Sequence, residues 1–278
     1  MKRNLLCWIC GIFLFTACND DDSPIPNEAV TKAFQTKYPA AEQVEWEHKG
    51  AYLKAEFIDN QLSHSAWFDA NGQWHMTETE LNRLELLPEA VRKAFGNSEY
   101  ADWTTDDIDR LDRQQAETLY VIEVKKDKQE FDLYYSQDGI LMKAVPDTDQ
   151  DDYEQYLPGP IPSAVTEWID SRYPGARIIE VENEHGLIEA DIIYNNKSME
   201  VVFNSSYEWI DTHYDVTTDE VEETVLQALN TAYGDYLIDD IEKYETPEGN
   251  YYVFELEKGA TEIDIKIDLE GNIQKWQK

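Results

Sequence analysis

Cysteine is scarce in this chain of 278 residues, and all three cysteines, Cys7, Cys10 and Cys18, lie within the first eighteen positions. The rest of the sequence has no thiol. This excludes a disulfide framework, structural zinc held by cysteines and catalysis by a cysteine nucleophile. The fold must therefore be held by an apolar core, and a chain of this length can bury one.

Positive charge is also scarce, because 23 Lys and Arg stand against 58 Asp and Glu and give a net charge of −35. Such a charge repels phosphates, so we predict no nucleic-acid partner. Glycine and proline, 12 and 10 residues, are too few for a collagen-like or low-complexity chain. With 42% hydrophobic and 12% aromatic residues the chain is not a disordered acidic tail. We expect one large globular domain or two of ordinary size.

The N-terminus carries an apolar run, Leu5–Ala17, that follows two basic residues. The run is too short to cross a bilayer as a helix, which takes about 20 residues, but it suits a secretory signal. Because it ends on small residues before Cys18, it resembles a bacterial lipoprotein signal. The resemblance implies that residues 1–17 are removed and that Cys18 is acylated. An ordinary secretory signal with an unrelated cysteine is the alternative.

Residues 18–27 are predicted to form an acidic tether, since Asn19–Ser23 contains three consecutive aspartates. A charged tether of this kind is usually a solvated spacer. It also resembles the acidic export signal of surface lipoproteins in some Gram-negative anaerobes. We predict an outer-membrane lipoprotein of the cell envelope, and leave open whether it faces the surface or the periplasm.

An internal repeat organises the rest of the chain. Four predicted helices share one pattern, in which an apolar residue follows a valine after four positions and so lies on the same helical face. The four pairs are Val30 and Phe34, Val91 and Phe95, Val165 and Ile169, and Val225 and Leu229.

Strand-like segments and a short hairpin turn follow each helix. Three of the turns carry a glycine, Gly72, Gly139 or Gly271, where a tight turn requires a positive φ. Tyr207 takes the glycine's place in the third unit, and we expect a distorted or longer turn there. We therefore predict that each of the four units has the element order α-β-β-β.

The valines are 61, 74 and 60 residues apart, and the longer middle interval contains an acidic and proline-rich stretch, residues 146–160. This composition is typical of a linker. We therefore predict two tandem domains, residues 28–145 and 161–278, each made of two units. The order of elements predicts an α+β fold, an antiparallel sheet with helices packed on one face.

The helix that ends in Tyr38-Pro39, the Val44–Trp46 strand and the Trp67–Gly72 hairpin resemble the PepSY-like family, secreted proteins of the beta-lactamase-inhibitor-protein fold. The resemblance covers residues 28–145 and 161–278. It implies the architecture, but it brings no catalytic motif with it.

We find no sequence pattern for catalysis. No HExxH pair, G-x-S-x-G elbow, phosphate loop or dinucleotide fingerprint is present. Asp147–Asp151 begins like a calcium loop, but Asp152 and Pro158 stand where glycine and glutamate are needed. We predict no enzyme activity, no cofactor and no metal site, and leave open weak divalent-cation binding by the acidic linker.

Strand alternation assigns the faces of the predicted sheet. Leu53, Ala55, Phe57, Ala66 and Phe68 should face the helices, and their neighbours should lie on an open face. The predicted binding residues on that face are Tyr52, Lys54, Glu56, Trp67 and Asp69 in the first unit, Asp132 and Tyr134 in the second, and Tyr251, Glu255 and Lys266 in the fourth.

Aromatic side chains among charges on an open face suit contact with a protein or ligand. The resemblance adds to this, because the namesake inhibitor binds its enzyme with the concave face of such a sheet. The alternative is a set of cross-strand pairs that only stabilise the sheet. If Trp67 is exposed, Trp67→Ala should change stability by no more than about 0.5 kcal/mol, and Phe68→Ala should be the costly substitution.

We therefore predict a non-catalytic, envelope-anchored module, inhibitor-like in its mode of binding. Its partner would be an envelope or extracellular protein, a peptide or another ligand, and its membrane contact the lipid on Cys18. A structural or accessory lipoprotein with weak divalent-cation binding is the second hypothesis. A hydrolase with an unfamiliar site is the third.

Overall fold

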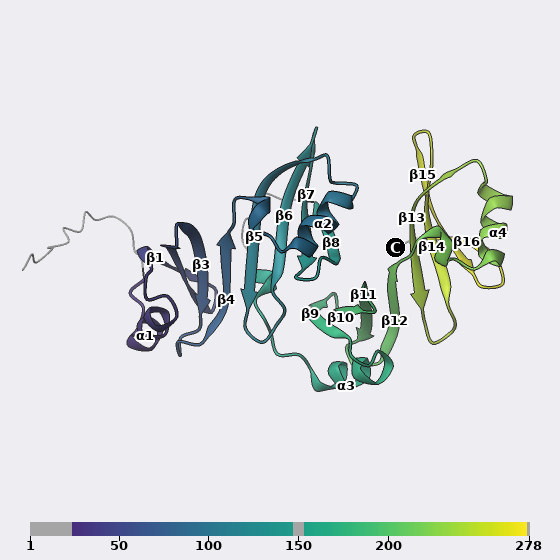
Figure 1. Ribbon diagram of the computed structural model, residues 1–278. Coiled ribbons are helices and arrows are strands. Elements are labelled where there is room, and N and C mark those ends of the chain that lie inside the picture. Colours follow the sequence, from purple (N-terminus) through teal and green to yellow (C-terminus); the bar gives the residue numbers. More distant parts are fainter. Residues whose placement is uncertain (1–23, 147–152, 277–278) are drawn as a thin grey trace, which may run out of the picture.

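The computed structural model describes residues 24–146 and 153–276 (Figure 1). The predicted signal segment, Cys18 and the calcium-like aspartates fall outside these residues. Within them the chain forms four α-helices and two antiparallel sheets of eight strands each. The helices are α1 (Glu28–Lys37), α2 (Glu89–Asn97), α3 (Ser163–Arg172) and α4 (Glu223–Tyr233).

The first sheet follows the order of the chain, so every strand is joined to its neighbour by a hairpin or by a connection that carries α2. Its strands are β1 (Glu42–Lys49), β2 (Tyr52–Asp59), β3 (Leu62–Phe68), β4 (Trp74–Glu80), β5 (Thr104–Arg113), β6 (Leu119–Lys126), β7 (Gln129–Ser136) and β8 (Leu141–Pro146).

The second sheet repeats this plan, with α4 in the connection between its fourth and fifth strands. Its strands are β9 (Arg177–Glu184), β10 (Leu187–Tyr194), β11 (Lys197–Asn204), β12 (Trp209–Asp215), β13 (Leu237–Glu245), β14 (Tyr251–Lys258), β15 (Thr261–Asp268) and β16 (Ile273–Lys275). The predicted α+β fold with tandem domains is confirmed. Four strands rather than three follow each helix, because the segment after each turn pairs as a further strand.

The helical pattern of the sequence is borne out by burial. Val30 and Phe34 of α1 are buried with Ala55, Phe57 and Phe68 against the first sheet. The corresponding residues of the other three helices are buried in the same way, namely Val91 and Phe95, Val165 and Ile169, and Val225 and Leu229. Each helix therefore packs one apolar stripe on its own four strands.

In the first two units the hairpin turn lies in close contact with the first turn of the helix. Gly72 has φ +83°, and a Cβ there would lie 2.6 Å from the carbonyl oxygen of Ala29 in α1. Gly139 has φ +81°, and its Cβ would lie 2.5 Å from the carbonyl oxygen of Ala90 in α2. Only glycine fits these contacts, since both the backbone angle and the space exclude a side chain.

The turn at Tyr207 is neither longer nor distorted, so that expectation is wrong. Tyr207 adopts φ +62° and its N–H donates to the carbonyl of Asn204 at 2.9 Å, as Gly72 does to Asp69 at 3.0 Å. Tyr207 is exposed, and the position tolerates a left-handed tyrosine because its side chain points to solvent.

An apolar cluster on the helix-free side joins the two domains. This interdomain cluster consists of Trp67, Met76, Leu111, Leu119, Val121, Tyr134, Tyr156, Ile179 and Ile193. Most members belong to the first sheet, Tyr156 to the short 3₁₀ helix η2 (Tyr153–Tyr156), and Ile179 and Ile193 to β9 and β10. The helix-free face of the first sheet is thus covered by residues that follow it in the chain.

The described part of the predicted linker is packed on the first sheet. Tyr156 stacks on Tyr134 with ring centroids 4.8 Å apart. The hydroxyl of Tyr153 donates to Asp109 Oδ2 of β5 at 2.9 Å. This segment is therefore part of the interface between the domains.

Candidate functional site

The predicted binding residues of the first sheet lie on the predicted face, but that face is not open. Trp67 is 0% exposed, Tyr134 3% and Lys54 9%. The expectation that Trp67 is exposed is wrong, because the interdomain cluster covers it. Alternation assigned the face correctly but could not show what packs against it.

The polar residues of this group make contacts within the sheet. Lys54 pairs with Glu47 at 3.2 Å and with Glu56 at 3.0 Å, at the exposed margin of β2. Asp69 accepts from the backbone N–H groups of Asn71 at 2.9 Å and of Gln73 at 2.8 Å, so it closes its own turn.

Two further residues of the group lie beside the interdomain cluster. Tyr52 packs against it and lies edge-on to His75, with ring centroids 5.0 Å apart. Asp132 accepts a 3.4 Å hydrogen bond from the hydroxyl of Tyr134. Neither residue is placed where it meets the predicted residues of the second sheet.

The predicted aromatic residue of the second sheet is also buried, so the expectation that Tyr251 lies on an open face is wrong. Tyr251 is 9% exposed, because it is stacked between neighbours: its ring lies 5.0 Å from that of Tyr244, and Lys266 Nζ lies 3.4 Å from the Tyr251 centroid. His213 stacks on the other side of Tyr244 at 4.7 Å. In the row His213, Tyr244, Tyr251 and Lys266 two stacked aromatic rings lie between two cations, an arrangement stabilised by cation–π attraction. Glu255 lies exposed further along β14.

Beside this row lies an acidic pocket of about 230 Å³. β9 to β13 supply most of its wall, and Met142 and Lys143 of β8 close it from the first domain. The charged residues that line it are Glu180, Glu182, Glu189, Asp191, Glu200, Asp215, Glu242, Lys143 and His213. Seven carboxylates therefore face two cations in one small cavity.

Three carboxylates of the acidic pocket, those of Glu180, Asp191 and Asp215, have a raised pKa. Burial raises the pKa of Glu180 to about 7, although Lys143 at 3.5 Å opposes the rise. Burial and neighbouring carboxylates raise the pKa of Asp191 to about 6 and that of Asp215 to about 6. A positive charge entering the pocket would lower these pKa values, since an opposite charge favours the ionised form.

His213 is already paired with two carboxylates, that of Glu200 in the pocket and that of Asp211 on its own strand. Burial by itself lowers the pKa of His213. Asp211 at 2.9 Å and Glu200 at 3.5 Å raise this pKa by more than burial lowers it, so it is about 10. The imidazole is therefore a cation at neutral pH and does not act as a general base. Among the described residues no group of three or more His, Cys, Asp or Glu is arranged to hold a metal ion.

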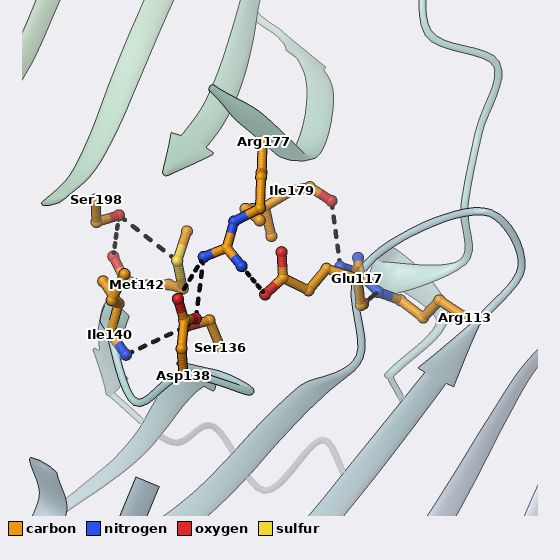
Figure 2. A network of polar contacts seen from close by, with 9 residues as sticks. All are labelled: Arg113, Glu117, Ser136, Asp138, Ile140, Met142, Arg177, Ile179 and Ser198. Carbon is orange, nitrogen blue, oxygen red and sulfur yellow. Dashed lines mark hydrogen bonds and ion pairs between the residues drawn. The ribbon is translucent and has the colours of Figure 1, made fainter. Parts of the chain in front are cut away.

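Polar contacts fix the position of the two domains around this pocket (Figure 2). Arg177 of β9 pairs with Asp138 at 2.9 Å and with Glu117 at 3.3 Å. Arg113 donates to the carbonyl oxygen of Ile179 at 3.2 Å, and the hydroxyl of Ser198 donates to the carbonyl oxygen of Met142 at 3.3 Å. β9 is thus held against β5 and the turns that flank β6 and β7, and β8 lies against β11.

Sequence reasoning missed the residues that close these interdomain sites. Lys143 and Arg113 are isolated basic residues of ordinary strands, and no local pattern marks them. Glu180 and Asp191 look like solvated charges on alternating strands. Their burial depends on the first domain, which lies beyond the reach of local periodicity.

The fold and these sites define a class: a protein of two tandem α+β domains whose sheets carry helices on one face only. A family described as "Putative beta-lactamase-inhibitor-like, PepSY-like" matches residues 51–143 and 189–275, one stretch in each domain. Since these matches cover more than half of the chain, the chain belongs to the PepSY-like family, as the sequence resemblance indicates. The family description names no catalytic activity.

Several solved structures each match about half of this chain. A BLIP-like protein from Bacteroides fragilis is 36% identical, covers 48% of this chain and 94% of its own, with a TM-score of 0.45. A DUF2874 family protein from Bacteroides ovatus is 32% identical, covers 47% and 94%, with a TM-score of 0.45. A structure from Bacteroides eggerthii titled "putative periplasmic proteins" is 22% identical, covers 48% and 95%, with a TM-score of 0.44. No curated protein matches the sequence.

No helix of the described residues is both long and apolar enough to span a membrane.

Proposed function

We propose that this protein is a non-catalytic binding module of the cell envelope that takes a cationic group of a protein or peptide partner into the acidic pocket. The observation that supports this is the pocket itself, where seven carboxylates meet two cations in about 230 Å³. The family has no catalytic motif to suggest chemistry, and His213 is held as a cation between acids.

The size of the pocket selects the kind of ligand. Sites for whole small molecules usually enclose about 300–1,000 Å³, so this pocket suits one side-chain head group. A lysine ammonium or an arginine guanidinium would pair with these carboxylates, and its charge would favour their ionised form against the effect of burial.

Titration calorimetry with N-acetyl-lysine amide and N-acetyl-arginine amide tests this proposal, with the neutral N-acetyl-norleucine amide as control. The cationic ligands should bind more tightly than the neutral one, and salt should weaken them through screening. Asp191→Asn should reduce binding, while Glu56→Gln on the first sheet should not. Equal binding of the neutral analogue, or none by either cation, would contradict the proposal.

A pull-down from envelope extract then tests for a macromolecular partner. A defined protein that is captured by the wild type and lost with Asp191→Asn would identify the natural ligand. A protein that both variants retain would place the contact elsewhere on the surface.

The position in the envelope is proposed from the N-terminal sequence. Acylation of Cys18 after removal of residues 1–17 would tether the module to the outer membrane, and several acyl chains are needed for stable attachment. Cys18→Ser should release the protein into the soluble fraction. A variant that stays in the membrane, together with an intact mass that shows no lipid on the wild type, would exclude the anchor.

A further inference from the structure

A second and larger cavity, of about 560 Å³, lies where the linker, the first sheet and β9 meet. Its wall has three parts: the β4–β5 end of the first sheet, the segment 155–161 and the strand β9. Its lining differs from that of the acidic pocket, because amides, one arginine and apolar side chains dominate and Glu180 is the only carboxylate.

Arg113 is the only cation in this lining and is 6% exposed. Its guanidinium donates to two backbone carbonyl oxygens, from Nε to Glu117 at 2.9 Å and from Nη2 to Ile179 at 3.2 Å. Among the described residues it forms no ion pair, and burial lowers its pKa. The carboxylates of Glu180, Glu117 and Asp191 attract the guanidinium from a longer distance and partly offset its burial. Within the described residues none of them pairs with it directly, so an anion at hydrogen-bond distance in the cavity would add to its stabilisation.

The remaining polar groups of the cavity are chiefly hydrogen-bond donors or neutral amides. His75 lines it, and within the described residues neither ring nitrogen makes a hydrogen bond, although Nε2 lies 4.0 Å from Asp69 Oδ2. Gln114 and Gln155 add side-chain amides. The carboxylate of Glu180 is engaged by Lys143 at 3.5 Å on the side of the acidic pocket. These groups leave donors available for one further acceptor.

β9 presents its backbone edge to the cavity. Four consecutive residues of this strand, Ile178 to Val181, line the cavity. Successive side chains of a strand point to opposite faces of the sheet, so a cavity that contacts all four residues runs along the edge of the strand. β9 is the terminal strand of its sheet, and its register shifts at Ile179, whose carbonyl turns to Arg113. The unpaired edge of a terminal strand can accept an extended chain through main-chain hydrogen bonds.

We propose that this cavity binds a carboxylate, with Arg113 as its charge partner and with Leu157 and Ile161 against the apolar body of the ligand. A planar carboxylate suits the fork of a guanidinium. A phosphate dianion suits the site less, because one arginine and a chain of net charge −35 would have to balance two charges. A free organic acid and the C-terminus of an extended peptide offer the same group.

Calorimetry on the full mature chain separates these sources. Benzoate is compared with its neutral isostere benzamide, and N-acetyl-Ala-Leu is compared with the same peptide amidated at its C-terminus. The proposal expects benzoate or the free peptide to bind about tenfold or more tightly than its neutral counterpart, the size of one charge-assisted hydrogen bond. A preference for the peptide over benzoate assigns the C-terminus, and the reverse assigns the free acid. No carboxylate binding, or equal binding of the neutral forms, overturns the proposal.

Two variants locate the site. Arg113→Met should weaken carboxylate binding about tenfold or more, while Arg177→Met removes an exposed, ion-paired arginine of the same interface and should leave binding unchanged. If Arg113→Met fails to fold, Ala116→Leu decides, because it narrows the cavity and leaves the guanidinium in place. If the variant that folds binds the carboxylate as tightly as the wild type, the assignment of the binding site to this cavity is overturned. Glu180 stays intact throughout, so failure here does not bear on the acidic pocket.

Discussion

Trp67→Ala is the substitution that best tests how the two domains meet. In the structure Trp67 is completely buried on β3, among apolar residues of its own sheet and Ile179 and Ile193 of the second domain. Its neighbour Phe68 is equally buried on the opposite face, under α1. The two residues therefore report on two different cores from adjacent positions.

The expected loss follows from the side chain removed. Replacing a buried Trp or Phe by Ala costs about 3–5 kcal/mol of unfolding free energy, the sum of lost transfer energy and the cavity left behind. Two smaller effects modify the value for Trp67. Its indole N–H has no hydrogen-bond partner among residues 24–146 and 153–276, so the substitution removes an unsatisfied donor, a gain of about 1–3 kcal/mol. It also loses a cation–π contact with Lys54 Nζ, 5.4 Å from the ring, worth about 0.5–1 kcal/mol at an exposed site. We therefore expect about 2–4 kcal/mol for Trp67→Ala and about 3–5 kcal/mol for Phe68→Ala.

Urea unfolding of the full mature chain, followed by circular dichroism, measures both losses. Ile193→Ala, a substitution in the second domain, is the companion experiment. It should destabilise the same transition as Trp67→Ala, because both residues belong to the interdomain cluster. If Trp67→Ala changes the unfolding free energy by less than about 0.5 kcal/mol, Trp67 is a surface residue. The arrangement of the domains described here would then be refuted.

Three further predictions concern single sites. Burial raises the pKa of Asp109 to about 7, above its unfolded value, so its penalty is absent at low pH and grows as pH rises toward 7. Asp109→Asn should therefore stabilise the protein above pH 7, by at most about 4 kcal/mol, and weaken the pH dependence of unfolding between about pH 4 and about pH 7. Gly72→Ala should lower the unfolding free energy by at least about 2 kcal/mol in thermal or urea unfolding. Gly50→Ala is the control, because Gly50 has φ +54° but open space around its Cβ, and it should lower the unfolding free energy by about 1 kcal/mol. Equal losses in the two variants would contradict the contact between Gly72 and α1. Tyr207→Gly should stabilise the third hairpin by about 0.5–1 kcal/mol, and a loss would show that the tyrosine ring has a packing role.

The sequence predicted the elements of this fold because their signals are local. The spacing from Val30 to Phe34 fits one helical face, and the alternation of Ala55, Phe57 and Ala66 fits one face of a sheet. All five residues are buried as predicted. The repeat of the pattern was sufficient to predict two domains of the same kind.

The sites depend on contacts that are remote in the chain, and here local patterns were insufficient. Alternation assigned Trp67 to the helix-free face, but its cover comes from Tyr156 and Ile179, some ninety residues or more further along. Arg113 and Lys143 acquire their roles only where β8 and β9 are brought together. A pattern confined to one strand carries no information about the domain that packs on it.

The cover over the first sheet has a consequence for stoichiometry. Two repeated domains would ordinarily give a bivalent molecule, with two equivalent faces for two copies of a partner. Here the second domain and the linker occupy the helix-free face of the first, so the chain is monovalent with respect to any ligand of that face. A partner of the acidic pocket should form a one-to-one complex, without the gain in avidity that a tandem repeat otherwise provides.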